Sequence, residues 1–317
     1  MVSITGKVLR ILPYKEVQVG DVSKKVVDLI IADELDYRRV SFWDDKAELV
    51  VNGTLKVGDV LRIENARVPE GDEKRANVGR FMTVTRISTR VAALSRISSR
   101  NLTVLAVARP EKGQVCIAGI DNNGDWIRPQ GVYETDFAEK PLFKNLCISK
   151  LYMDTWRGGR PRKEDRFFVY GEGVRRVLNK KERREFLEQH VDDSVDAVFK
   201  RGRSLGLIKP QRIVHVYEER VRKKKRGVGY EHYIRFTFRD STSRRYRRWS
   251  CRCAAFYETW NELKQQHRLT CGWRMLRYLN NHDTYLAIGL TYSDYGAERL
   301  EYGAYPMIVG VHVVENP

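Results

Sequence analysis

One short run places basic and aromatic side chains on the same face of an expected strand. The segment RRVSFWD alternates strictly, so Val40 and Phe42 are expected to face the core. Arg39, Ser41 and Trp43 then point the other way. An exposed indole can stack on any base, and a neighbouring guanidinium can contact a phosphate. Trp43 and Arg39 are therefore candidates for binding a single strand, with Lys15 a weaker one; the alternative is that Trp43 caps the core.

A second candidate is the basic run VRKKKRG, which is expected at the tip of a hairpin. Its cations are Arg222, Lys223, Lys224, Lys225 and Arg226. A hairpin tip of this composition can reach along a phosphate backbone, which carries dense negative charge. The alternative is a solvated charged loop with no specific partner.

A third candidate is SRRYRRWSCR, which we interpret as part of a helical stretch from Arg244 to His267. Its basic residues Arg244, Arg245, Arg247 and Arg248 are interleaved with Tyr246 and Trp249. This composition suits a surface that combines phosphate contacts with stacking. Alternatively, Trp249 packs inward and the arginines cover acidic patches such as VDDSVD.

The turn DNNGDWIRP supplies Trp126 and Arg128 as candidates for ligand contact. The alternative is that both residues stabilise the turn.

Metal chemistry has one weak candidate site. Cys251, Cys253 and Cys271 lie within about twenty residues of one another, near His267, and thiolates with an imidazole can hold zinc. However, the CxC spacing is tighter than the usual CxxC, and the odd total of five cysteines argues against a disulfide framework. We expect buried or unpaired thiols and no cofactor.

No enzyme motif is found. The chain has no P-loop, no complete dinucleotide fingerprint and no HEXXH. Asp192, Asp193 and Asp196 are interpreted as exposed partners of nearby basic residues, while Asp240, Glu258 and Asp283 could be assembled only by folding. We assign no catalytic residue and expect a binding protein; a metal-dependent single-strand nuclease and a protein-binding adaptor are the rival interpretations.

The elements that position these residues are mostly strands. Residues 1–90 predict five short strands, with a short helix at KAELVV between the third and fourth, which is the strand order of an OB barrel. PEGDEKRAN is interpreted as the loop before the last strand. Residues 91–101 are the predicted linker. Residues 102–317 predict a larger β-rich region with a helical insertion at about 174–206, ended by Gly202 and Gly206.

Charge indicates the class of partner. The chain of 317 residues carries 58 Lys and Arg against 41 Asp and Glu, a formal net charge of +17. Positive charge of this size favours a polyanion, most commonly nucleic acid. No apolar run approaches the length of a membrane span, and the N-terminus lacks the features of a signal peptide, so we expect a cytoplasmic protein without a membrane partner.

The combination of an IIAD strand, RRVSFW, the helical DKAEL and a GDV strand resembles the OB domains of archaeal replication protein A and related single-stranded DNA-binding proteins. The resemblance covers nearly all of residues 3–88 and implies that Trp43 stacks on a base. The second aromatic of that family has no counterpart in PEGDEKRAN, and Phe81, somewhat later, is the candidate for its role.

The C-terminal two-thirds is similar, in short strand motifs, to the prokaryotic dual OB-containing domain. The motifs are DNNGDWIRP, YLAIGLTYS and AYPMIVGVHVV. This resemblance implies two further OB-like barrels and a nucleic-acid or nucleotide ligand. The whole sequence predicts a protein that binds single-stranded DNA in replication, repair or defence, with little sequence preference; RNA and other DNA-processing proteins are further expected partners.

Overall fold

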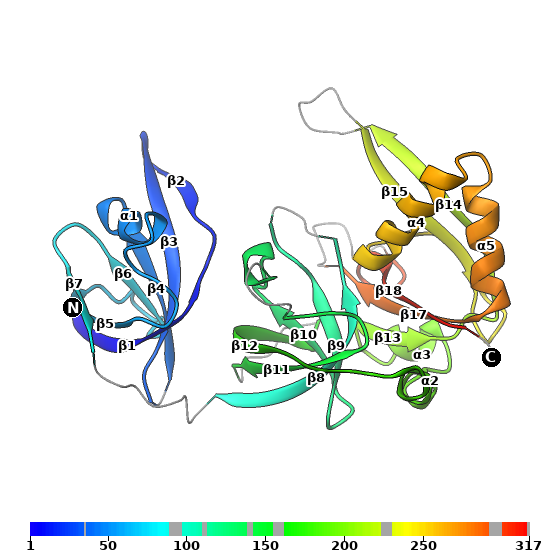
Figure 1. The fold of residues 1–317 in the computed structure, drawn as a ribbon, viewed down its shortest axis with the longest axis horizontal. Coiled ribbons are helices and arrows are strands. Elements are labelled where there is room, and N and C mark those ends of the chain that lie inside the picture. Colours follow the sequence, from blue (N-terminus) through cyan, green and yellow to red (C-terminus); the bar gives the residue numbers. More distant parts are fainter. Residues whose placement is uncertain are drawn as a thin grey trace. The chain divides into compact units, whose positions relative to one another are not determined.

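The computed structural model describes residues 1–34, 36–88, 97–109, 113–137, 142–154, 162–222, 230–291 and 300–315. They divide into two compact units: Met1–Ser99 with Leu151–Thr155 and Phe168–Gly171, and the remaining residues. The fold is mostly β, with three sheets and a few helices, as the sequence predicts (Figure 1). No helix in the described ranges is long and apolar enough to cross a membrane.

The N-terminal sheet has the strand order of an OB fold. Its strands β1, β3 and β4 form an antiparallel meander, β4 pairs in parallel with β6, and β5 pairs with both β1 and β7. The short helix α1 (Asp45–Val51) follows β4, as expected. The strands are β1 (Val2–Ile11), β2 (Lys15–Val19), β3 (Val22–Ala32), β4 (Tyr37–Trp43), β5 (Val60–Ala66), β6 (Arg75–Val78) and β7 (Thr83–Ile87).

Two details of this sheet differ from the sequence prediction. The segment PEGDEKRAN is not entirely a loop, because β6 begins at Arg75; its inward residues are only Ala76 and Val78, so its pattern is too short to stand out. The hairpin of β2 and β3 was also not predicted. It turns at Gly20, whose φ of 62° is a conformation that glycine adopts without strain.

The second sheet closes into a barrel in the order β10-β12-β11-β8-β9. The third and fifth strands along the chain, β10 and β12, pair in parallel, and a 3-10 helix (Glu134–Phe137) lies between the third and the fourth. This is the OB order again. The strands are β8 (Ser98–Val107), β9 (Ile117–Asp121), β10 (Trp126–Gln130), β11 (Cys147–Met153) and β12 (Asp165–Val177).

The third sheet repeats the same order with its first strand split into two pieces. The order is β13-β17-β18-β16-β15-β14, with β16 and β18 parallel and the helices α4 and α5 between the third and fourth strands. The helices α4 (Ala254–Gln266) and α5 (Cys271–Asn281) lie beside β14 and β15 in Figure 1. The strands are β13 (Leu205–Ile208), β14 (Arg212–Arg222), β15 (Tyr230–Arg239), β16 (Arg245–Cys251), β17 (Asp283–Leu290) and β18 (Pro306–Val314).

The predicted boundaries shift in two places. The helical insertion is shorter than 174–206: β12 continues to Val177, and the helices are α2 (Lys180–Gln189) and α3 (Val195–Phe199). Gly206 does not end a helix but lies inside β13, where a Cβ would approach Val198 to 2.4 Å. Within the predicted linker, residues 91–96 lie outside the described residues and β8 begins at Ser98.

One apolar cluster joins the second and third sheets. It combines residues of β8, β9 and β10 with residues of β13, β17 and β18, including Leu105, Trp126 and Tyr285. The backbones approach closely here, because a Cβ on Gly310 would lie 2.0 Å from the carbonyl oxygen of Leu105. Since glycine has no Cβ, it permits this approach. The two sheets therefore share a core.

Candidate nucleic-acid interface

The outer face of β4 presents the polar residues that the alternation predicts. Val40 and Phe42 are fully buried in the N-terminal core, whereas Arg39, Ser41 and Trp43 are partly exposed. Trp43 belongs neither to this core cluster nor to the described side chains packed against it. Its indole N–H donates to Asn77 Oδ1 at 3.1 Å. The structure therefore places Trp43 outside the core, held by one hydrogen bond at the end of β4.

Asp28 on β3 organises the cations of this face. Its carboxylate accepts hydrogen bonds from Lys15 Nζ at 2.8 Å, Arg39 Nη2 at 2.6 Å and Ser41 Oγ at 2.6 Å. Burial alone would raise the pKa of Asp28, but the hydrogen bonds from Lys15, Ser41 and Arg39 outweigh it and lower the pKa. Two cations thus share one carboxylate, and they are prepositioned on the face rather than being free.

Sequence reasoning missed Asp28 and Asn77. The signal for Asp28 was present, because a carboxylate inside the apolar run VVDLII must find a partner when it is buried. Asn77 gave no such signal. It meets Trp43 only because β6 runs parallel to β4, with Asn77 in register with Ser41.

Phe81 lies in the turn between β6 and β7 and is 93% exposed. Because Val78 is in register with Phe42, the turn that follows β6 emerges at the end of β4 where Trp43 lies. The structure therefore brings the two candidate aromatic residues to the same end of this sheet. Phe81 lies outside PEGDEKRAN because the end of that segment belongs to the strand β6, and the turn that holds Phe81 follows this strand.

The third candidate run, around residues 244–248, forms a strand and not a helix. Tyr246 and Trp249 are buried in the core of the third sheet, so the expectation that Tyr246 stacks on a base is wrong. Arg248 has a φ of 58°, at a break in the pairing between β15 and β16. This bulge leaves both Arg247 and Arg248 outside. The doubled arginine disguises the strand alternation in the sequence, which is why the prediction failed.

The arginines of this strand have different surroundings. Arg244 pairs with Asp196 at 2.6 Å and with Glu301, as the alternative of a covered acidic patch proposed. Arg248 pairs with Glu219. Arg245 and Arg247 are exposed. Near them lies a hollow of about 430 Å³ that is lined by Arg247, Arg248, Tyr233 and Tyr305, among others.

The basic hairpin between β14 and β15 is only partly described. Arg222 ends β14 and pairs in register with Tyr230. Lys223, Lys224, Lys225 and Arg226 lie outside the described residues.

Trp126 and Arg128 are both buried in β10. Trp126 packs in the apolar cluster that joins the second and third sheets, so the expectation that it contacts a ligand is wrong. Arg128 is 2% exposed and donates to Asp165 Oδ1 at 3.0 Å and to Ser204 Oγ at 3.1 Å. Burial raises the pKa of Asp165, although Arg128 and Arg162 both act to lower it. Arg128 nevertheless lines a cavity between the second and third sheets.

The candidate zinc ligands lie on different elements of the fold. Cys251 lies in β16, Cys253 precedes α4, Cys271 begins α5, and His267 ends α4. Burial raises the pKa of each of the three thiols. Over the described ranges, no three His, Cys, Asp or Glu side chains gather in a way that could hold a metal ion.

The acidic candidates serve as local partners. Asp192 pairs with Arg203, Asp196 with Lys200, and Asp283 with Lys209 at 2.7 Å. Asp240 accepts from the hydroxyl of Tyr246 at 3.1 Å.

Comparison with known proteins shows similarity over part of the chain. No protein-family model matches. Replication factor A of Methanothermobacter thermautotrophicus is 36% identical over 70 residues, which are 22% of this chain. This chain covers only 8% of the length of that protein. Part of the chain therefore resembles replication factor A.

Three matches among solved structures all have TM-scores below 0.5. The solution structure of a replication factor A related protein from Methanobacterium thermoautotrophicum is 28% identical and matches 27% of this chain and 79% of its own, with a TM-score of 0.24. A replication protein A heterotrimer bound to single-stranded DNA is 8% identical. The match covers 100% of this chain and 93% of that chain, with a TM-score of 0.33. A murine DNA-binding protein bound to double-stranded DNA is 13% identical. The match covers 53% of this chain and 97% of that chain, with a TM-score of 0.29.

Proposed function

We propose that this protein binds single-stranded DNA through the outer face of its N-terminal sheet, with residues 1–90 acting as the binding domain. The observation that carries the proposal is the position of Trp43, outside the core and held through its N–H by Asn77. A ring held in this way loses little conformational freedom when a base stacks on it. The resemblance of part of the chain to replication factor A supports the same function.

The cations beside Trp43 supply the second component of binding. Lys15 and Arg39 are ordered by Asp28, yet their side chains remain 41% and 25% exposed. Two positive charges against one carboxylate leave the face positive, which favours a phosphate next to a stacked base. Neither stacking nor phosphate contact distinguishes one base from another, so we expect little sequence preference.

Substitution of Trp43 tests the proposal. Stacking contributes about 1–3 kcal/mol per base, so Trp43→Ala should raise the Kd for a labelled oligothymidylate about 5- to 150-fold. Fluorescence anisotropy measures this change, and Trp43→Phe should retain part of the affinity. The matched control is Trp273→Ala, because Trp273 is another exposed tryptophan, 60% accessible, in α5.

An unchanged Kd for Trp43→Ala would remove Trp43 from the site. The same mixtures, run on a denaturing gel with and without Mg²⁺, separate binding from cleavage. Intact strands support a binding protein, whereas shortening that a chelator abolishes would favour the nuclease interpretation.

A further inference from the structure

The second unit contains a cavity of about 450 Å³ between its two sheets. One wall comes from β10 and the segment before β9, and the other from β17, β18 and the residue after β16. The shared core beneath it, together with a backbone hydrogen bond of 2.8 Å from Arg109 to Arg252, holds these walls together. Cavities of this size are typical of small-molecule sites.

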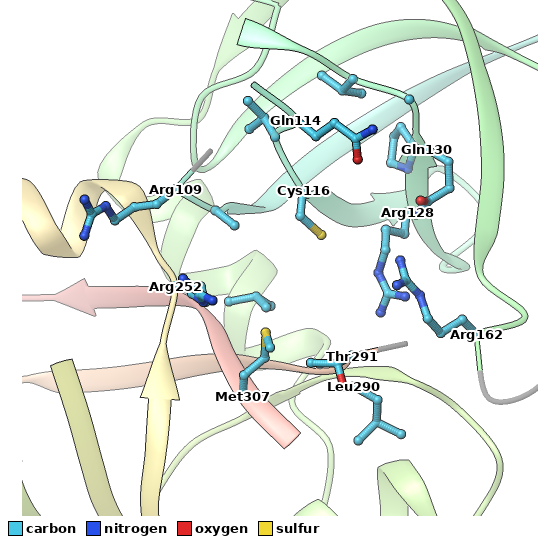
Figure 2. Close-up of a pocket in the computed structure, with 17 residues that line it drawn as sticks. Arg109, Gln114, Cys116, Arg128, Gln130, Arg162, Arg252, Leu290, Thr291 and Met307 are labelled. Atoms are coloured by element: carbon cyan, nitrogen blue, oxygen red, sulfur yellow. The ribbon is translucent and has the colours of Figure 1, made fainter. Parts of the chain in front are cut away.

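Arginines line this cavity on both walls. Figure 2 shows the guanidinium groups of Arg128 and Arg162 side by side on one wall, with Arg252 on the other. The Arg252 guanidinium also lies 5.4 Å from the ring centroid of Tyr233. Arg109 also lines the space, but its guanidinium turns away and lies 4.2 Å from the ring centroid of Tyr257. No Asp or Glu is among the described lining residues. Guanidinium groups that line one space suit the binding of an anion such as phosphate.

The arginine pair is held from behind by a buried carboxylate. Asp165 is 1% exposed and accepts from Arg128 at 3.0 Å and from Arg162 Nε at 3.1 Å. Ser204 fixes the other end of the Arg128 guanidinium. A second buried carboxylate, Glu164, accepts from the backbone N–H and the hydroxyl of Ser204 and so lies beside the same group. These hydrogen bonds orient the guanidinium groups before a ligand arrives, which suits recognition of phosphate.

The rest of the lining fits a nucleoside better than a bare anion. Val132, Leu290 and Met307 offer an apolar surface for a base, and Gln114, Gln130 and Thr291 offer hydrogen-bonding groups at its edges. A terminal phosphate carries about 1.5 to 2 negative charges at neutral pH, against one for each phosphate of a strand. Converging arginines therefore favour a terminal phosphate.

We propose that this cavity binds a nucleotide through its terminal phosphate, held by Arg128, Arg162 and Arg252. The nucleotide is either free or the phosphorylated end of a strand. The hollow near Arg247 adjoins the cavity, since Arg252 and Met307 line both, and a strand whose end enters the cavity could extend toward this hollow. The site does not depend on binding at Trp43.

Cys116 provides a direct probe of occupancy. Its thiol points into the cavity in Figure 2, and it is exposed, whereas the other four cysteines are buried. The experiment measures the rate at which iodoacetamide alkylates Cys116 in the full chain, by mass spectrometry of its peptide. AMP should slow this reaction in a saturable way and adenosine should not. Equal rates with and without AMP, or equal protection by adenosine, would overturn the proposal.

Variants test the role of the arginines. Arg252→Gln leaves the buried Arg128–Asp165 pair intact and should weaken protection by AMP at least tenfold. The matched control is Arg268→Gln, at an exposed position between α4 and α5. In this variant AMP should protect Cys116 as it does in the wild type. Circular dichroism confirms that each variant is folded. A wild-type response in Arg252→Gln would contradict the assignment of Arg252.

Oligothymidylates with a 5′-phosphate, a 3′-phosphate or two hydroxyl ends distinguish a free nucleotide from the phosphorylated end of a strand. Protection by AMP alone identifies a free nucleotide, and protection by one phosphorylated strand identifies a strand end. Equal protection by the hydroxyl-ended strand would overturn recognition of a terminal phosphate. The Trp43→Ala variant should keep the protection by AMP, so failure of the proposed strand binding and failure of this site are separate results.

Discussion

The buried imidazole of His312 should make the second unit sensitive to acid. His312 lies on β18 and is 4% exposed, and its Nε2–H donates to the carbonyl oxygen of Leu105 on β8 at 2.8 Å. Burial lowers the pKa of His312 from 6.5 to about 4; the hydrogen bond to Leu105 acts in the opposite direction, and the charge of Arg183 lowers the pKa further. The neutral ring thus bridges the second and third sheets.

The size of the effect follows from the two pKa values. Between pH 6.5 and pH 4 the unfolded chain binds a proton at His312 that the folded protein excludes, so stability falls as the pH falls through this window. With an unfolded pKa of about 6.5, the loss relative to neutral pH is about 2 kcal/mol at pH 5 and about 3 kcal/mol at pH 4. Above pH 7 the contribution is fully present.

Urea unfolding of the full chain at pH 7.5, 6.0 and 5.0 measures this loss. His312→Gln removes the titration and keeps an N–H that can donate to Leu105, so its stability should fall less than that of the wild type between pH 7.5 and 5.0. The difference between the two falls should be about 2 kcal/mol. The matched control is His215→Gln, which makes the same substitution at an exposed histidine on β14 and keeps the buried imidazole of His312.

Parallel profiles for the wild type and His312→Gln would refute the reasoning. That result would mean that His312 titrates alike in the folded and unfolded chains, and so is not held as a buried neutral ring between the sheets.

Two further predictions concern single packing positions. Asp28→Asn should lower the free energy of unfolding of the N-terminal sheet by about 2 kcal/mol, because a buried carboxylate loses charge-assisted hydrogen bonds from Lys15 and Arg39; urea unfolding measures this, and an unchanged stability would contradict the charge assignment. Gly310→Ala should destabilise the second unit by about 1–3 kcal/mol, because its Cβ would lie 2.0 Å from the Leu105 carbonyl oxygen. Faster amide hydrogen exchange in residues 98–107 and 306–314 reports this change, and unaltered exchange there would show that the backbones tolerate a methyl group.

The strands of this protein could largely be predicted from the sequence, because buried strands are apolar runs or strict alternations. RRVSFW became β4 with the predicted residues on each face, and PMIVGVHVV became β18. The prediction was wrong where charge interrupts the pattern. The run RYRRWSC is a strand whose bulge at Arg248 places two arginines on one face, and RANV is a short strand with only two inward residues.

The candidate sites were less predictable, because burial depends on neighbours that are distant in the chain. Trp126 and Tyr246 have the composition of ligand contacts, yet Trp126 packs in an apolar cluster contributed by two sheets, and Tyr246 packs in one contributed by the strands and helices of the third sheet. Trp43 has the same composition and lies outside the core. The sequence next to these three residues does not show which of them is buried in a core.

What the sequence determined by itself is the class of protein: mostly β, strongly basic, with an OB order of strands at its N-terminus. Those properties follow from local periodicity and from net charge, which need no knowledge of contacts. Only the tertiary structure decided which cations come together. Arg128, Arg162 and Arg252 face one cavity because the third sheet packs on the second through a shared core, and Asp28 meets Lys15 and Arg39 because three strands lie in register. Such contacts depend on the pairing and packing of whole strands, which residue spacing along the chain does not specify.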